Sequence, residues 1–193
     1  MVDIFNTDKK YNIIYADPPW KYGGGMNKKT FQGLATVHYP TMKTKEICAL
    51  PVPSAEDCIL FMWVTPPQME DGLKVMKAWG FKYKTVGFTW IKTYSSGKPC
   101  VGLGYYTRSN AEMCLIGVKG NIKRINNTVS SVIISERERH SKKPDEVRER
   151  IVELMGDLPR IELFARETFP GWDCWGNEIT ENDMVCKQME LEL

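Results

Sequence analysis

Long apolar runs and a leader segment are both missing from this sequence of 193 residues. The longest apolar run, Cys58 to Val64, is far too short to cross a bilayer, which requires about 20 residues. No charged and apolar leader opens the sequence. We therefore expect a cytoplasmic protein with no membrane segment.

Metal-ligating patterns are also scarce. The six cysteines show no C-x-x-C spacing, and the only histidines are His38 and His140. Zinc sites normally draw four ligands from such residues at short spacings. We expect reduced cysteines and no bound metal.

The sequence has little net charge, which is +2 at neutral pH. A general attraction to polyanions is thereby excluded, and any binding of nucleic acid must depend on local basic groups. Three such groups occur, and the third is equally consistent with a solvated surface because glutamates are interspersed in it. They are Lys21, Lys28 and Lys29; Lys119, Lys123 and Arg124; and Arg137, Arg139, Lys142 and Lys143.

Length and composition indicate one globular domain over residues 1–193. Hydrophobic residues make up 42% and charged residues 26% of the chain, which are ordinary values for a folded protein. The chain is long enough for one well-buried core and short for two. We expect residues 178–193 to form a loosely attached acidic tail.

Strand-like and helix-like segments alternate, which is typical of an α/β fold with a mainly parallel sheet and helices on both faces. The expected strands are Ile13 to Ala16, Ile59 to Val64, Lys82 to Lys92, Met113 to Val118, Val129 to Ser135 and Arg160 to Ala165.

Two helices are predicted. In Pro66 to Trp79, an apolar face is formed by Met69, Leu73, Met76 and Trp79, and Gly80 can end the helix. In the second, Pro144 fits the first helical position and Gly156 follows the last. Its apolar face consists of Val147, Ile151, Leu154 and Met155.

The tetrapeptide Asp17-Pro18-Pro19-Trp20 follows the apolar run Tyr11 to Ala16 directly. The exocyclic amine of adenine is a poor nucleophile, because its lone pair is delocalised, so an enzyme must hold both N–H bonds. Asp17 can accept one, and the carbonyl of Pro18 the other, since a Pro-Pro pair is a stiff turn. Trp20 offers a face on which a base can stack, which is worth about 1–3 kcal/mol. This pattern predicts a catalytic site for adenine methylation.

The alternative is a strand that simply ends in an Asp-Pro-Pro turn, with Trp20 packed in the core. Two long stretches, Lys21 to Pro40 and Thr93 to Arg108, lack clear periodicity. Such loops in a compact domain are usually functional or disordered. Both are candidate lids.

Seven short segments carry further information. They are Ala16 to Trp20, His38 to Met42, Leu60 to Val64, Trp90 to Thr93, Glu112 to Asn121, Lys143 to Glu146 and Ile161 to Arg166. Together and in this order, they resemble the adenine amino-group methyltransferases that include the catalytic subunit of the messenger-RNA adenosine methyltransferase and its bacterial and phage relatives. The resemblance implies a Rossmann-like class I methyltransferase fold with a permuted motif order, in which S-adenosylmethionine binds at the carboxyl ends of the strands.

The resemblance also implies a set of cofactor-binding residues. Asp17 would lie beside the methionine part, and Lys143 would pair with its carboxylate, although without the resemblance an ordinary surface lysine is the better interpretation of Lys143. The full set is Asp3, Ile4, Asp17, Lys143, Arg166, Glu167, Thr168, Asn177 and Glu178. Glu178 departs from the glutamine of the family, and Glu167 departs from the histidine of the messenger-RNA enzyme.

Substrate-side candidates lie on the flanking loops or lead into a strand. They are Tyr39, Lys92, Tyr105, Arg108 and Glu112. For Tyr39, burial beside Pro40 is an equally good interpretation. For Glu112, the alternative is that it merely opens a strand, and the resemblance favours a functional role.

The substrate implied by the resemblance is nucleic acid, with DNA favoured over RNA, and a homodimer or a partner subunit is expected. Two other functions remain open. A non-catalytic scaffold of the same fold is one, although Asp17, Lys143, Arg166 and Asn177 are all present. Methylation of a small molecule or protein is the other, but this function does not explain the presence of Trp20 and the basic loops.

Overall fold

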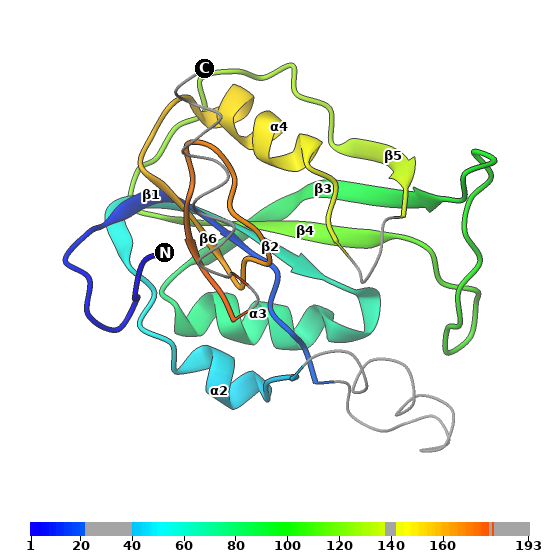
Figure 1. Ribbon diagram of the computed structural model, residues 1–193, viewed down its shortest axis with the longest axis horizontal. Helices are drawn as coiled ribbons and strands as arrows, with labels where there is room; N and C mark the ends of the chain where they lie inside the picture. Colours follow the sequence, from blue (N-terminus) through cyan, green and yellow to red (C-terminus); the bar gives the residue numbers. More distant parts are fainter. Residues whose placement is uncertain (22–39, 138–141, 178, 180–193) are drawn as a thin grey trace.

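The computed structural model describes residues 1–21, 40–137, 142–177 and 179 (Figure 1). Seven strands form its sheet: β1 (Tyr11–Ala16), β2 (Ser54–Val64), β3 (Lys82–Thr93), β4 (Glu112–Lys119), β5 (Val132–Glu136), β6 (Arg160–Leu163) and β7 (Asp173–Trp175). The helices are α2 (Thr44–Cys48), α3 (Met69–Ala78) and α4 (Glu146–Met155), and a 3-10 turn, η1 (Pro66–Gln68), precedes α3.

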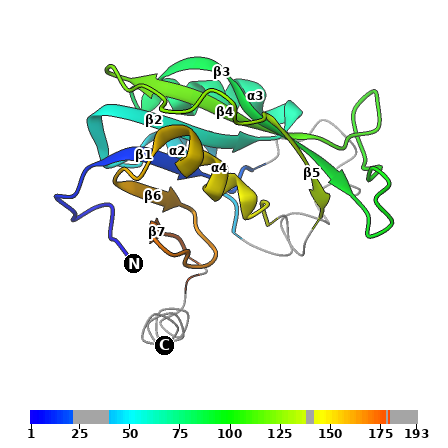
Figure 2. The same cartoon turned by 90° about the horizontal axis from the view of Figure 1, so that it is seen from above.

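The sheet has the strand order β5-β3-β4-β2-β1-β6-β7. Strand β4 pairs antiparallel with β2 and β3, whereas every other strand pairing is parallel. Figure 2 shows β6 and β7 on one side of β1 and the β2, β4 and β3 strands on the other. The predicted α/β, Rossmann-like fold with a mainly parallel sheet is confirmed.

Each face of the sheet has its own core. Ile14 belongs to the cluster under α2 and α3, and its neighbour Ile13 belongs to the cluster under α4. Successive side chains of a strand point to opposite faces of the sheet. The four residues from Ile13 to Ala16 are all buried, so both faces of β1 are covered. Figure 1 shows α4 on one face and α2 and α3 on the other, which confirms the predicted helices on both faces.

The buried face of α3 differs from the predicted one. Leu73 is exposed, and Gly72 and Val75 are buried in its place. A Cβ atom on Gly72 would lie 2.5 Å from Cγ1 of Val64, so this glycine allows the helix to approach β2 closely. The face of α3 that contains Gly72 and Val75 therefore packs against the sheet. Gly80 follows the end of the helix with a φ of 82°, which glycine adopts without strain.

The remaining boundaries differ by a few residues. Pro144 lies before α4, which begins at Glu146, and β6 ends at Leu163 because the next residue leaves the extended conformation. The short elements α2 and β7 were not predicted. No helix among the described residues is long and apolar enough to span a membrane.

The strand directions place the predicted site residues at one edge of the sheet. The carboxyl ends of β1, β2, β6 and β7 meet there because these strands are parallel. Strand β4 runs the other way, so its first residue, Glu112, reaches the same edge.

The packing predicts the cost of truncating the central strand. Ile14→Ala should lower the free energy of unfolding by about 2–5 kcal/mol, because it leaves a cavity at a fully buried position. Val132→Ala on the edge strand β5 is the control and should cost less than about 0.5 kcal/mol, since Val132 is exposed. Urea unfolding measures both, and equal losses would contradict the described core.

Candidate active site

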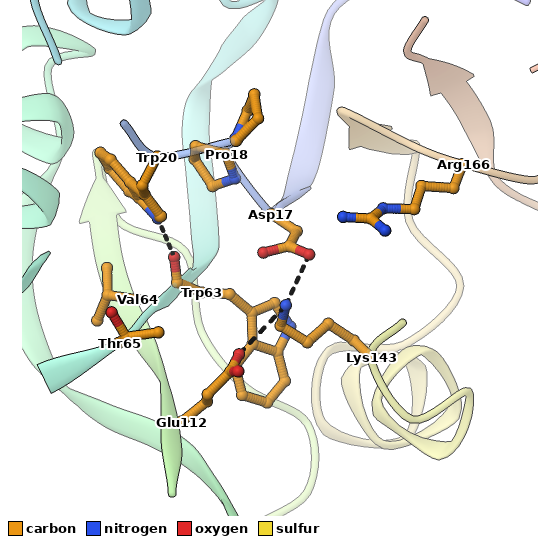
Figure 3. Close-up of a pocket in the computed structure, with 10 residues that line it drawn as sticks. Asp17, Pro18, Trp20, Trp63, Val64, Thr65, Glu112, Lys143 and Arg166 are labelled. Atoms are coloured by element: carbon orange, nitrogen blue, oxygen red, sulfur yellow. Dashed lines mark hydrogen bonds and ion pairs between the residues drawn. The ribbon is translucent and has the colours of Figure 1, made fainter. Parts of the chain in front are cut away.

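The Asp17-Pro18-Pro19-Trp20 segment forms a tight turn at the carboxyl end of β1 (Figure 3). The N–H of Trp20 donates to the carbonyl oxygen of Pro18 at 2.8 Å, and the N–H of Met42 donates to that of Pro19 at 2.8 Å. A carbonyl oxygen has two lone pairs, so the carbonyl of Pro18 retains one for a further donor. The turn holds Asp17 with its carboxylate partly exposed in a hollow.

The Trp20 side chain is placed differently from the prediction. The residue is only 6% exposed, and its indole N–H donates to the carbonyl oxygen of Trp63 at 3.1 Å. Buried indoles usually find such a partner, and this one ties the turn to the end of β2. Trp20 therefore lines the hollow as part of the wall instead of presenting an open stacking face.

A chain of alternating charges crosses the hollow. The ammonium of Lys143 lies 2.7 Å from Oδ2 of Asp17 and 3.2 Å from Oε2 of Glu112. The other oxygen of Glu112 pairs with Lys92. Figure 3 shows Lys143 between the two carboxylates and above the indole of Trp63, whose ring centre is 5.6 Å from the ammonium.

These contacts keep the buried side chains of Lys143 and Glu112 charged. Burial opposes the charge on Lys143, but the carboxylates of Asp17 and Glu112 outweigh it and raise the pKa of this lysine. Burial likewise opposes the charge on Glu112, but Lys143 and Lys92 together lower the pKa of this carboxyl. Lys143 and Glu112 are therefore a buried charged pair, which contacts Asp17 on one side and Lys92 on the other.

A second ion network fixes the segment that carries Lys143. Arg148 on α4 makes two hydrogen bonds to the carboxylate of Glu162 on β6, at 2.7 and 3.0 Å, and a third to Asp145 at 2.6 Å. Both Arg148 and Glu162 are buried. Burial opposes the charge on Arg148, but Glu162 outweighs it and raises the pKa of this guanidinium. The pair ties the start of α4 to β6, which leads into Arg166.

Two adjoining hollows share Asp17, Pro19 and Arg166. The first is lined by Asp17, Pro18, Pro19, Trp20, Trp63, Val64, Thr65, Glu112, Lys143 and Arg166. The second is lined by Asp17, Pro19, Pro40, Met42, Phe164, Ala165, Arg166, Trp175, Gly176 and Asn177. Asp17 therefore faces both.

The second hollow has an unusual backbone. Phe164 has a φ of 62°, in the left-handed region that a bulky residue rarely adopts. Its ring packs edge-on against Trp175, with centroids 5.3 Å apart. A Cβ atom on Gly176 would lie 2.0 Å from the carbonyl oxygen of Ala165, so glycine is required there. The lining of the second hollow thus combines the aromatic side chains of Phe164 and Trp175 with the polar residue Asn177.

The structure brings together most of the predicted site residues. Asp17, Pro18, Pro19, Trp20, Lys143, Glu112, Arg166 and Asn177 line the two hollows, and Lys92 contacts Glu112. Tyr39 and Glu178 lie outside the described residues.

The other predicted residues are not among those that line the hollows. Tyr105 and Arg108 are exposed on the loop between β3 and β4. Asp3 accepts hydrogen bonds within its own turn, and Ile4 is buried in the core. Glu167 pairs with Lys142 at 3.1 Å. The lining of neither hollow includes Thr168.

Sequence reasoning missed several lining residues. Trp63, Val64 and Thr65 could have been found, because a strand parallel to β1 must end beside Asp17. Phe164 and Trp175 carry no such signal, since a positive φ at phenylalanine and a three-residue strand leave no local pattern. The described residues contain no group of three His, Cys, Asp or Glu placed to hold a metal.

Comparison with known proteins identifies the family. The family model described as MT-A70 matches residues 11–178. The chain belongs to the MT-A70 family. This confirms the predicted family and, with it, an adenine methyltransferase as the class of enzyme.

Individual relatives differ in how much of their length is matched. The Type II methyltransferase M.MunI of Mycoplasma sp is 43% identical to this chain. The match covers 90% of this chain and 80% of the length of that protein. An N(6)-adenosine-methyltransferase MT-A70-like protein of Arabidopsis thaliana is 31% identical over 92% of this chain and 24% of its own. The N(6)-adenosine-methyltransferase catalytic subunit METTL3 of Homo sapiens is 31% identical over 88% of this chain and 28% of its own. The chain thus spans most of the Mycoplasma protein and about a quarter of the other two.

The buried ion pair between Arg148 on α4 and Glu162 on β6 predicts a large loss of stability on truncation that a second substitution rescues. Arg148→Met should lower the free energy of unfolding by about 3–5 kcal/mol, because Glu162 is left buried without its partner. The double variant Arg148→Met/Glu162→Leu should recover most of this loss. Lys74→Met, which breaks an exposed pair with Asp71 on α3, should cost about 0–1 kcal/mol. Urea unfolding measures all three, and a double variant no more stable than Arg148→Met would contradict the account.

The lowered pKa of Glu112 predicts a pH dependence. An ionised Glu112 stabilises the fold above its ordinary pKa of 4.5, and this contribution is lost as the pH falls through the lower folded value. The stability difference between wild type and Glu112→Gln should therefore be constant from about pH 7 to 5 and shrink in more acidic solution. Urea unfolding across this range tests it, with Glu56→Gln at an exposed position as the control. A difference independent of pH would contradict the ion pair.

Proposed function

We propose that the protein transfers a methyl group from S-adenosylmethionine to the exocyclic amine of adenine in DNA. The observation that carries the proposal is the position of Asp17, which faces both hollows at the end of β1. A group held in one hollow can therefore react with a group held in the other beside this carboxylate.

The second hollow suits the cofactor. Its aromatic residues, Phe164 and Trp175, can pack against the adenine ring of the cofactor, and Asn177 can bind the ribose hydroxyls of the cofactor. Arg166 lines both hollows, and Lys143 lines the adjoining first hollow. These two cations can pair with the carboxylate of the cofactor's methionine part. When bound, S-adenosylmethionine supplies an electrophilic methyl group on a positively charged sulfur.

The first hollow suits the target amine. Asp17 can accept one N–H, and the carbonyl of Pro18 retains a lone pair for the other. A carboxylate has about four acceptor positions, so Asp17 can bind the amine while it keeps its contact with Lys143. Holding both N–H bonds positions the nitrogen lone pair toward the methyl group. The extra proton then leaves through Asp17 or water.

DNA is preferred as the polymer. The match to a type II methyltransferase covers 80% of that protein, whereas the adenosine methyltransferases are matched over about a quarter of theirs. RNA is the alternative substrate, and a second copy or a partner subunit remains a prediction. A non-catalytic scaffold is disfavoured because the carboxylate, the two cations and Asn177 all line the hollows.

Removing the Asp17 carboxylate should abolish activity and leave the fold intact. Asp17→Ala should lower methyl transfer at least about 100-fold, because an acceptor that orients the amine is lost. The fold should persist, since Lys143 keeps Glu112 as a partner. Asp8→Ala, at an exposed position, is the control.

The measurement uses labelled S-adenosylmethionine with matched single- and double-stranded DNA and RNA, followed by mass identification of the modified nucleoside. Circular dichroism checks the fold. Wild-type turnover by Asp17→Ala, or a methyl group on another base, would contradict the proposal.

A further inference from the structure

The charges of this protein are strongly segregated along the chain. Residues 72–135 hold ten of the 26 Lys and Arg but only one of the 24 Asp and Glu. That one acid, Glu112, is buried and paired with Lys92 and Lys143. The segment runs from α3 through β3 and β4 into β5, so this stretch of the chain is positive although the whole chain is nearly neutral.

The loop of residues 94–111, here called the β3–β4 loop, extends this stretch of the chain beyond the active-site edge. Figures 1 and 2 show it projecting past the ends of β3 and β4. It leads directly into Glu112, which lines the first hollow. The loop contains no acid and carries Lys98 and Arg108.

The loop has a defined shape. The side chain of Asn110 accepts from the N–H of Lys92 at 2.9 Å and donates to the carbonyls of Lys92 and Cys100 at 2.8 and 2.6 Å. Farther out, the N–H of Gly102 donates to the carbonyl of Ser109 at 2.8 Å. A Cβ atom on Gly104 would lie 2.0 Å from the carbonyl oxygen of Thr107, so the two arms of the loop approach closely.

This shape leaves aromatic side chains in solvent. Tyr106 is fully exposed and Tyr105 is about half exposed at the tip. At the base, the guanidinium of Arg137 lies 5.4 Å from the ring centre of Tyr94. Exposed rings beside cations, on a loop that has no acid of its own, fit a strand of nucleic acid, because bases stack on aromatic faces while Lys and Arg contact phosphates.

We infer that the tip of the β3–β4 loop binds the DNA strand beside the target adenine, with Tyr106 stacked on a neighbouring base and Arg108 on a phosphate. This inference rests on the proposed function. It assigns polymer binding to a surface separate from the two hollows and adds Tyr106 to the substrate-side residues.

The test compares variants of the full chain. Fluorescence anisotropy with a labelled 30-nucleotide DNA of mixed sequence, single-stranded and as a duplex, measures the Kd. Tyr106→Ala should raise the Kd about tenfold, and Tyr106→Phe should bind as wild type, because stacking needs the ring. The control is Tyr83→Ala, an exposed tyrosine at the opposite end of β3. Arg108→Gln should reduce the slope of log K against log salt by about 1.

Two further readouts separate the explanations. In methyl transfer to unmethylated bacterial DNA, Tyr106→Ala should raise the KM for DNA more than it lowers kcat. Its affinity for S-adenosylmethionine by calorimetry should equal that of wild type. If wild type methylates DNA but Tyr106→Ala matches Tyr83→Ala in Kd, the loop inference is overturned and the proposed function stands. A change in oligomeric state by sedimentation, with DNA affinity unchanged, would also overturn it and make the loop a protein interface. Absence of adenine methylation by wild type would instead refute the proposed function.

Discussion

One buried ammonium group connects the parts of the site. Lys143 lies between Asp17, directly after β1, and Glu112 on β4, which are far apart in the sequence and come together only in the folded sheet. A buried charge without a partner costs several kcal/mol, so each of the three side chains constrains the other two. The reversed direction of β4 is what places Glu112 at this edge.

The rest of the site is built around this triad. The Arg148–Glu162 pair holds the start of α4 against β6, and β6 continues into Phe164 and Arg166. The same framework therefore positions Lys143 in one hollow and Phe164 in the other. Asp17 lies where the two hollows join, which is the geometry that methyl transfer between two bound molecules requires.

The sequence predicted the architecture because its signals are local. Apolar runs bounded by turns located every long strand, and the order of short segments located the family and the residues Asp17, Glu112 and Lys143. The unpredicted features depend on contacts between distant segments. Trp20 is buried because the carbonyl of Trp63 receives its N–H, and Val75 replaces Leu73 because Gly72 allows close approach to Val64.

A crystal structure with an adenosine joined covalently to a cofactor analogue would test the central claim most directly. The account predicts that the exocyclic nitrogen lies within hydrogen-bonding distance of both the Asp17 carboxylate and the Pro18 carbonyl. It also predicts the analogue's second adenine between Phe164 and Asn177. An exocyclic nitrogen bound elsewhere, with Asp17 still held only by Lys143, would contradict it.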